Sequence, residues 1–299
     1  MSPIESVATP RLKPSTSVAL ALVALYLIWG STYLAIRYVV EGLPVFLSGG
    51  VRYVLAGGLL YVILRMRGAR APTRREWLGA LPVGVLMFVG GNGFVALAER
   101  EVASSVAALV VAVTPIFAST MGLWVGERPS ARQWLGMVIG FGGVLVLSLG
   151  DLRATPSALF MLLGATICWA LGTQLSKRLP SAPSFMSAAT QMLTGGVALL
   201  GLGFARQESM PHEWTALAVG SLAYLVVLGS LVAYSAFNFL VRNTSTPIAM
   251  SYAYVNPVVA VILGTLVGGE ALGPSTFAAG ALVLLGVALL VTGRPRRTP

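Results

Sequence analysis

The sequence predicts an all-α membrane protein in which ten transmembrane helices form a 5+5 inverted-topology repeat. Three observations predict this fold: a shortage of charge, ten apolar runs and an internal repeat. Of the 299 residues, 56% are hydrophobic and only 10% are charged, and the mean hydropathy is +0.83. Because a soluble domain carries about a quarter charged residues, lipid must surround most of this chain.

Each expected helix is an apolar run of about 20 residues, the length that crosses a bilayer. Proline and glycine mark many of the short connections, which leave no room for a soluble domain. The expected spans are 18–39, 45–66, 77–98, 102–125, 131–149, 156–177, 183–205, 214–240, 245–267 and 273–293. The expected divisions are a disordered cytoplasmic tail 1–17, a first repeat 18–150, a second repeat 151–293 and a basic cytoplasmic tail 294–299.

The basic residues predict the orientation of these spans. If the N-terminus lies in the cytoplasm, the outer ends hold only Arg37, Arg100, Arg153 and Arg206 of the 20 Lys and Arg residues. Arg52 lies within a span, and the others fall on the cytoplasmic side, as the positive-inside rule requires. Both termini are therefore expected in the cytoplasm, in a protein of the cell inner membrane.

The remaining composition excludes several other classes of function. The net charge of +10 does not indicate a nucleic-acid partner, because the basic residues lie in short gaps between apolar runs. The only cysteine, Cys168, lies in an apolar run, and the only histidine, His212, lies in an outer loop. Neither supports a metal site, and no phosphate-binding loop or nucleophile elbow is present. No cofactor, metal or enzyme activity is expected.

The internal repeat is clearest in two apolar segments, "AVTPIFASTMGLWVGERP" and "YVNPVVAVILGTLVGGEALGP". Pro115 in the first corresponds to Pro257 in the second. Weaker echoes follow the same order along the chain: "IWGSTYLAIR" near Trp29 with "ICWALGTQLSKR" near Trp169, and "RYVLAGG" from Arg52 with "QMLTGGV" from Gln191. Two units of five helices must enter the membrane from opposite sides, and substrate sites of such proteins lie near the midplane. A duplication that only built a helical bundle is the alternative.

In these motifs the chain resembles the drug/metabolite transporter superfamily, in particular its EamA branch of ten-helix exporters. The resemblance covers essentially the whole chain after residue 17. It is carried by "IWGSTYLAIR", "VRYVLAGG", "GNGFVALAE", "SSVAALVVAVTPIF", "GERPSARQWLG" and "VNPVVAVILGTLVGGEALG". The resemblance implies proton-linked or passive movement of small metabolites, often amino acids and usually outward.

Polar side chains within the apolar spans mark a candidate pathway, because in hydrocarbon they are costly unless they face protein or water. Tyr234 and Asn238 lie one helical turn apart, as do Tyr252 and Asn256. The candidate substrate-binding residues are Trp29, Thr32, Asn92, Gln191, Tyr234, Asn238, Tyr252 and Asn256. Hydrogen bonding that only holds the helices together is the alternative.

Two charged residues each allow two interpretations. Arg52 could snorkel to the outer interface or pair internally, which we prefer, or it could meet a substrate carboxylate. Glu99, near the outer end of its span, is a candidate for proton coupling if it is buried. A solvated charge pair with Arg100 is the competing interpretation.

Prolines and glycines suggest which segments could bend and which helices pack closely. Pro115 and Pro257 each remove a backbone hydrogen bond near the middle of a span, so both are candidate hinges, with a static kink as the alternative. The spans 131–149 and 273–293 are rich in glycine and aliphatic residues. They are expected to stand outside the cavity as struts, or to form the contact of a homodimer.

The expected function is secondary transport that exports small metabolites by alternating access, with amino acids as the preferred substrates and broad selectivity. Aromatic faces would receive ammonium groups, and the side-chain amides would bind carboxylate or amino groups. Sugar phosphates, nucleotide sugars and hydrophobic cations are alternative substrates. Phosphates would need two or more deep basic residues, and cations a mid-span carboxylate. A membrane-embedded enzyme acting on lipid is a further alternative, for which no catalytic motif is present.

Overall fold

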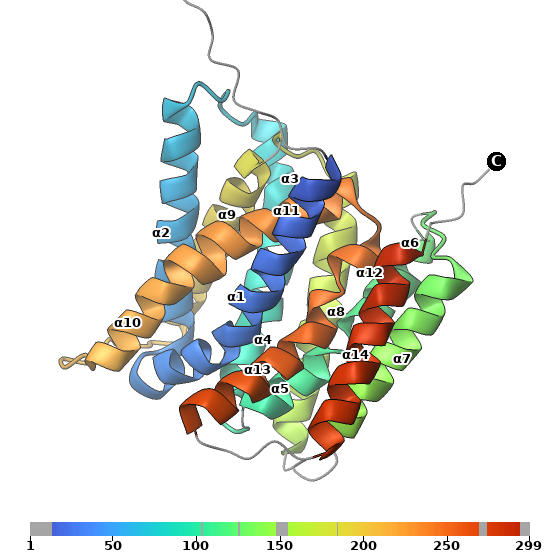
Figure 1. The fold of residues 1–299 in the computed structure, drawn as a ribbon. Helices are drawn as coiled ribbons and strands as arrows, with labels where there is room; N and C mark the ends of the chain where they lie inside the picture. The colour runs from blue at the N-terminus through green and yellow to red at the C-terminus, as the bar shows by residue number, and fades with distance from the viewer. Residues whose placement is uncertain are drawn as a thin grey trace, which may run out of the picture.

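The computed structural model describes residues 14–102, 104–124, 126–147, 155–183, 185–268 and 274–293. In these ranges the chain forms a bundle of helices (Figure 1). Residues 1–13 of the expected first tail, the expected boundary between the repeats at 150 and 151, and the expected tail 294–299 lie outside the described residues.

The helices of the first half lie close to the expected spans, except that the expected span 102–125 is divided between two helices. They are α1 (Pro14–Gly42), α2 (Val45–Met66), α3 (Arg74–Gly84), the π-helix η1 (Val85–Gly93), α4 (Phe94–Ala98), α5 (Ser104–Val111), α6 (Thr114–Trp124) and α7 (Ala131–Leu147). α3 begins with a capping box, in which Thr73 N donates to Glu76 Oε2 at 2.7 Å and Glu76 N donates to Thr73 Oγ1 at 3.3 Å. The segments α3, η1 and α4 follow one another without a break, so they form one rod.

The second half repeats this order of elements. It contains α8 (Pro156–Arg178), α9 (Phe185–Ala205), α10 (Ala216–Tyr224), the π-helix η2 (Leu225–Val232), α11 (Ala233–Asn243), α12 (Thr246–Ala249), α13 (Tyr252–Gly268) and α14 (Pro274–Thr292). Threonine side chains start α8 and α10, where Thr155 and Thr215 each accept a hydrogen bond from the backbone N–H three residues later, at 3.2 Å.

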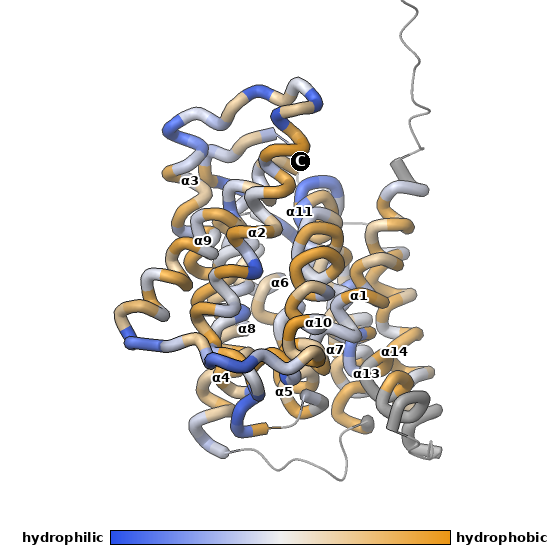
Figure 2. Tube along the Cα trace, turned by 90° about the vertical axis from the view of Figure 1, so that its left-hand side faces the viewer, coloured by the Kyte–Doolittle hydropathy of each residue, from blue (hydrophilic) through white to orange (hydrophobic). Residues whose placement is uncertain are grey.

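Seven helical segments among the described residues are long and apolar enough to cross a membrane. Two more, Ala131–Val146 and Ala278–Thr292, are apolar but shorter. Figure 2 shows hydrophobic residues along the helices and hydrophilic residues at several connections, such as the one between α2 and α3. The structure therefore confirms an all-helical protein with multiple spans, while the count of ten remains an expectation.

The two π-helices lie at corresponding points of the two halves, each between α-helical segments of one rod. A π-turn widens the backbone, and such turns are frequent at functional sites. Glycines in η1 let α8 approach closely: a Cβ at Gly91 would lie 2.8 Å from the Trp169 ring, and one at Gly90 would lie 2.6 Å from Cys168 Sγ. These glycines therefore help to place Trp169 next to η1.

Two pairs of helices pack closely along their glycines: α2 with α9, and α7 with α14. A Cβ on Gly196 would lie 2.8 Å from the backbone N of Val54, and one on Gly286 would lie 2.6 Å from Gly140 Cα. Small residues let membrane helices approach in this way. In Figure 1, α7 and α14 lie side by side at one edge of the bundle.

The bundle has two ends, which we name by their connections. The α1–α2 end carries the connection between α1 and α2, and the α2–α3 end carries the one between α2 and α3. In the orientation expected from the basic residues, the α1–α2 end is the outer one.

Candidate functional site

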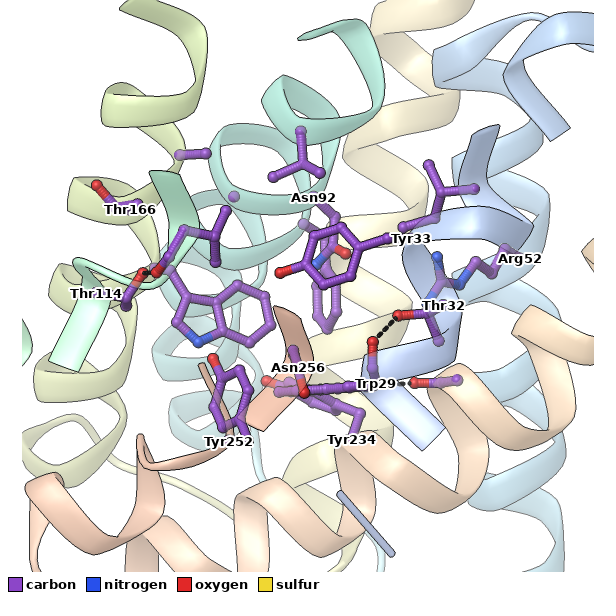
Figure 3. Close-up of a pocket in the computed structure, with 18 of the residues that line it drawn as sticks. Trp29, Thr32, Tyr33, Arg52, Asn92, Thr114, Thr166, Tyr234, Tyr252 and Asn256 are labelled. Carbon is purple, nitrogen blue, oxygen red and sulfur yellow. Dashed lines mark hydrogen bonds between the residues drawn. The ribbon is translucent and has the colours of Figure 1, made fainter. Parts of the chain in front are cut away.

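A pocket lies between helices of both halves, and Figure 3 shows the side chains around it. Its volume is about 70 Å³, below the 300–1,000 Å³ typical of sites for drug-sized ligands. The structure brings most of the expected site residues to this pocket: Trp29, Thr32, Asn92, Tyr234, Tyr252 and Asn256. In this conformation the space suits a small solute.

Aromatic rings form one wall of the pocket. The ring of Trp29 lies 4.7 Å from that of Tyr252 and 5.5 Å from that of Trp169, both edge to face, and 5.3 Å from that of Phe237. Its Nε1 donates to the carbonyl of Gly229 at 2.9 Å. Edge-to-face packing and this hydrogen bond hold the indole in one orientation.

The polar groups on the pocket differ in whether they already have a partner. Thr32 Oγ1 donates to Trp29 O at 2.8 Å, and Asn92 Nδ2 donates to Met87 O at 3.3 Å. By contrast, Asn256 Oδ1 and Trp169 Nε1 are buried and find no hydrogen-bond partner among the described residues. They offer one acceptor and one donor to a bound solute.

Trp169 was not among the expected site residues, although the repeat aligns its motif with that of Trp29. That alignment was the available signal. Its indole meets the rings of Trp29 and Phe237, each at 5.5 Å. The two tryptophans therefore come from corresponding helices of the two halves and face the same pocket.

Gln191 and Asn238 do not line the pocket but lie behind Tyr234. The Tyr234 hydroxyl donates to Gln191 Oε1 at 2.6 Å, and Asn238 Nδ2 donates to the same oxygen at 3.0 Å. Arg242 then donates from Nε to Asn238 Oδ1 at 3.1 Å and from a terminal nitrogen to Ser187 Oγ at 2.7 Å. We call these five residues the closed layer, since their hydrogen bonds connect α9 to α11 toward the α2–α3 end.

Arg52 lies in α2 and lines the pocket, with only 7% of its surface exposed. Its Nε donates to Ser230 Oγ at 2.7 Å, and its guanidinium lies 4.7 Å from the centre of the Tyr53 ring. Of the two interpretations that we preferred, snorkelling is therefore wrong, because the charged end faces inward, where Ser230 is its hydrogen-bond partner. The position of Arg52 along its apolar run predicted how deep in the membrane it lies, but not the direction in which its side chain points.

Glu99 follows α4 at the α1–α2 end and is 4% exposed. Within the described part of the chain neither carboxyl oxygen has a hydrogen-bond partner, so Glu99 is not part of a solvated pair with Arg100. Burial raises the pKa of Glu99 well above its usual range, and Arg37 opposes this shift. A separate hollow of about 360 Å³ at this end is lined by Arg37, Val40, Glu41, Glu99, Arg100, Glu101 and Val102.

The two prolines lie in different settings. The chain breaks between α5 and α6, and Pro115 is the second residue of α6. Thr114 Oγ1 donates to the carbonyl of Val111 at 2.6 Å, which satisfies a group that the break leaves free. α13 continues through Pro257, while the break in that rod lies at Met250 and Ser251. Hinge motion at either proline stays a prediction.

A model of the EamA-like transporter family matches the chain twice, over residues 16–149 and 156–292. The chain belongs to the EamA-like transporter family. These two matches cover the two halves described above, and membership makes the protein a membrane transporter.

Relatives of this EamA-like protein are also named as transporters. An Escherichia coli (strain K12) protein, the uncharacterized inner membrane transporter YedA, is 39% identical over 279 residues, which cover 92% of this chain and 90% of that protein. A Streptantibioticus cattleyicolor protein, a probable terminal-alkyne amino-acid exporter, is 26% identical over 90% of this chain and 92% of its own length. The chain is thus a multi-pass protein of the inner membrane.

A crystal structure of another protein, 18% identical in sequence, superposes with a TM-score of 0.75 over 92% of this chain and 96% of that one. The fold of this EamA-like protein is therefore shared with a solved structure.

Proposed function

We propose that this EamA-like transporter exports small metabolites, with amino acids as preferred substrates, by alternating access through the central pocket. The observation that carries the proposal is the pocket itself, which lies between the two halves and is lined by aromatic rings and by polar groups without partners. The two halves act as five-helix units of opposite orientation, with both chain termini in the cytoplasm.

The packing of the helices supports an inverted repeat. α1 packs against α13 and against the rod of α10, η2 and α11. In the same way, α8 packs against α6 and against the rod of α3, η1 and α4. The pairs α2–α9 and α7–α14 each join corresponding helices of the two halves. This is the arrangement expected around a pseudo-twofold axis in the membrane plane.

Alternating access requires ties that break at one end when the pocket opens there. Besides the closed layer, Lys177 Nζ donates to Glu127 Oε1 at 2.5 Å and to Thr246 Oγ1 at 2.7 Å. These contacts join α8 to the start of α12 and to the segment after α6. Opening of the α2–α3 end would separate these groups and let cytoplasmic solute reach the pocket.

The chemistry of the pocket favours amino acids. The rings of Trp29 and Tyr252 can attract an ammonium group, and Asn256 Oδ1 can accept its hydrogen bond. Among the described residues that line the pocket none is acidic, and Arg52 alone is basic. A cation exporter would need a carboxylate there, and a phosphate carrier would need more than one basic residue.

Glu99 is the proposed site of proton coupling. In this conformation its carboxyl group is buried, and a buried carboxyl keeps its proton more readily than an exposed one. Hydration of Glu99 when the protein rearranges would favour release of that proton. Proton coupling would then follow from a change in the burial of Glu99 rather than from a change in its hydrogen-bond or ion-pair partner.

The test is uptake of labelled amino acids into proteoliposomes, with and without a pH gradient. We expect flux of small amino acids, and we expect it to fall in Asn92→Ala, Asn256→Ala and Asn238→Ala. Thr120→Ala is the matched control, because the exposed Thr120 hydroxyl bonds only to the carbonyl of Ile116 on its own helix. Absence of amino-acid flux would remove the substrate class, and unchanged flux in all three variants would remove the site.

A further inference from the structure

Arg52 is a buried cation for which the described part of the protein supplies no counter-charge. The ion pairs there are Arg37–Glu41, Arg70–Glu76 and Lys177–Glu127. Arg52 makes one hydrogen bond, from Nε to Ser230 Oγ. Its two terminal nitrogens donate to no described group, although only 7% of the surface of Arg52 is exposed. In Figure 3, Arg52 reaches the pocket from the side opposite Thr114 and Thr166.

The local structure orients this guanidinium. Ser230 lies in η2, and its hydroxyl holds Nε so that the two terminal nitrogens remain free. Gly229, next to it, leaves the necessary room, because a Cβ there would lie 3.2 Å from an Arg52 terminal nitrogen. The ring of Tyr53 lies against the guanidinium at 4.7 Å. Three neighbouring groups therefore hold Arg52 in place without neutralising its charge.

A buried charge is costly unless it is paired, and arginine cannot lose its proton to avoid this cost. The free pair of terminal nitrogens is a planar fork that matches a carboxylate in a bidentate geometry. The residues that the structure describes around the pocket include no carboxylate. The missing anion must therefore come from outside the described protein.

We infer that Arg52 binds the single carboxylate of the transported solute. This inference rests on the proposed function, in that it takes the central pocket as the substrate site. It specifies the substrate class as small monocarboxylates, with or without an amino group. The neutral part of the solute would lie against Trp29 and Trp169, and an amino group would meet Asn256 Oδ1.

The same geometry predicts what the pocket rejects. The primary amide of an amino acid has no negative charge, so it would leave Arg52 unpaired. A dicarboxylate would pair one charge with Arg52 and leave the second buried, because the described lining holds no other cation. Selectivity for one negative charge thus follows from having one guanidinium in the pocket.

A binding assay on purified full-length protein in detergent tests the inference without requiring transport. Quenching of tryptophan fluorescence is a suitable signal, since Trp29 and Trp169 line the pocket. The ligands are L-alanine and L-leucine, each with its amide and its deaminated acid, together with L-aspartate. We expect the acids to bind at least about tenfold more tightly than the amides and L-aspartate. Hydrogen bonds to charged groups contribute enough binding free energy to account for a tenfold or larger difference in affinity.

The variants separate charge from structure. Arg52→Gln is expected to lose the preference for acid over amide to within about twofold, whereas Arg52→Lys, which keeps the charge, is expected to retain a weaker preference. Ser230→Ala should weaken binding of the acids by freeing the guanidinium. Arg206→Gln is the matched control, because Arg206 lies 5.6 Å over the ring of Phe46, away from the pocket. It should bind as the wild type does.

Three results would overturn the inference: amides that bind the wild type as tightly as the acids, no binding by any acid, or a preference that survives Arg52→Gln. If Arg52→Gln fails to fold, the wild-type panel and Arg52→Lys still decide, since loss of preference in a folded Arg52→Lys also contradicts it. Binding of acids without flux in proteoliposomes would contradict the transport proposal but support Arg52. Flux of amides at the rate of the acids would support the transport proposal but contradict the role of Arg52.

Discussion

Arg52 and Gln191 occupy corresponding positions of the two halves, yet the structure places them in opposite environments. Arg52 faces the pocket with terminal nitrogens that have no described partner. Gln191 is 1% exposed, and its Oε1 accepts hydrogen bonds from both Tyr234 and Asn238. At this position the first half therefore offers an unpaired cation to a solute, while the second half uses the corresponding residue in the closed layer.

This difference is what an alternating-access cycle would require. Two halves with the same fold can exchange conformations only if corresponding positions do not have the same environment at the same time. In this conformation Arg52 lies on the pocket, and Gln191 lies in the closed layer toward the α2–α3 end. The comparison predicts which substitutions affect solute binding and which affect the stability of this conformation.

The largest effect is expected for Arg52→Gln. Removing one member of a buried charge pair costs about 2–5 kcal/mol, so uptake of a transported amino acid, measured as kcat/KM in proteoliposomes, should fall at least about thirtyfold. Uptake by Arg206→Gln, the control, should match the wild type. Equal uptake by Arg52→Gln and wild type would remove the contrast between the two positions.

A smaller effect, on stability rather than binding, is expected for Gln191→Leu. The substitution leaves buried Asn238 Nδ2 without its acceptor, and it leaves the Tyr234 hydroxyl only the weak acceptor Met87 Sδ, at 3.2 Å. Each unsatisfied group costs about 1–3 kcal/mol, so the unfolding temperature in detergent should fall. Thr120→Ala should leave it unchanged. A Gln191→Leu protein as stable as the wild type would show that the closed layer does not hold this conformation.

The smallest effect is expected for Glu99→Gln, and it should appear only as a change in pH dependence. Because the pKa of Glu99 is raised in the folded protein, its protonated form stabilises this conformation at low pH, and that contribution is lost as pH rises through the raised pKa. Wild-type stability should therefore fall more steeply than that of Glu99→Gln as pH rises from the usual pKa of a glutamate carboxyl through the raised pKa of Glu99. The measurement is thermal unfolding across that pH range.

Glu101→Gln is the control for this measurement. The pKa of exposed Glu101 is lowered by hydrogen bonds from Ser157 and Thr155, so its contribution is lost only toward acid pH. The variant should follow the wild type above the usual pKa of a glutamate carboxyl, where the contribution of Glu99 is lost. Parallel profiles for the wild type and Glu99→Gln would argue against Glu99 as a titrating group.

Much of the candidate site was predictable from the sequence because polar side chains in hydrocarbon are costly unless they face protein or water. Trp29, Asn92, Tyr252 and Asn256 all reach the pocket, as expected from their depth within apolar spans. The inward direction of Arg52 was not predictable, because spacing along one helix does not say which neighbour that helix will face.

The sequence by itself determined that this chain crosses a membrane, that it consists of two similar halves and that it belongs among EamA-like transporters. Composition, apolar run length and repeated motifs carry that information, since each follows from local residue order and from the lipid surroundings. Only the tertiary structure decided which polar groups are paired and which face the pocket. Those properties depend on how helices rotate and approach one another, and contacts between residues far apart in the chain, such as Arg52 with Ser230, set that arrangement.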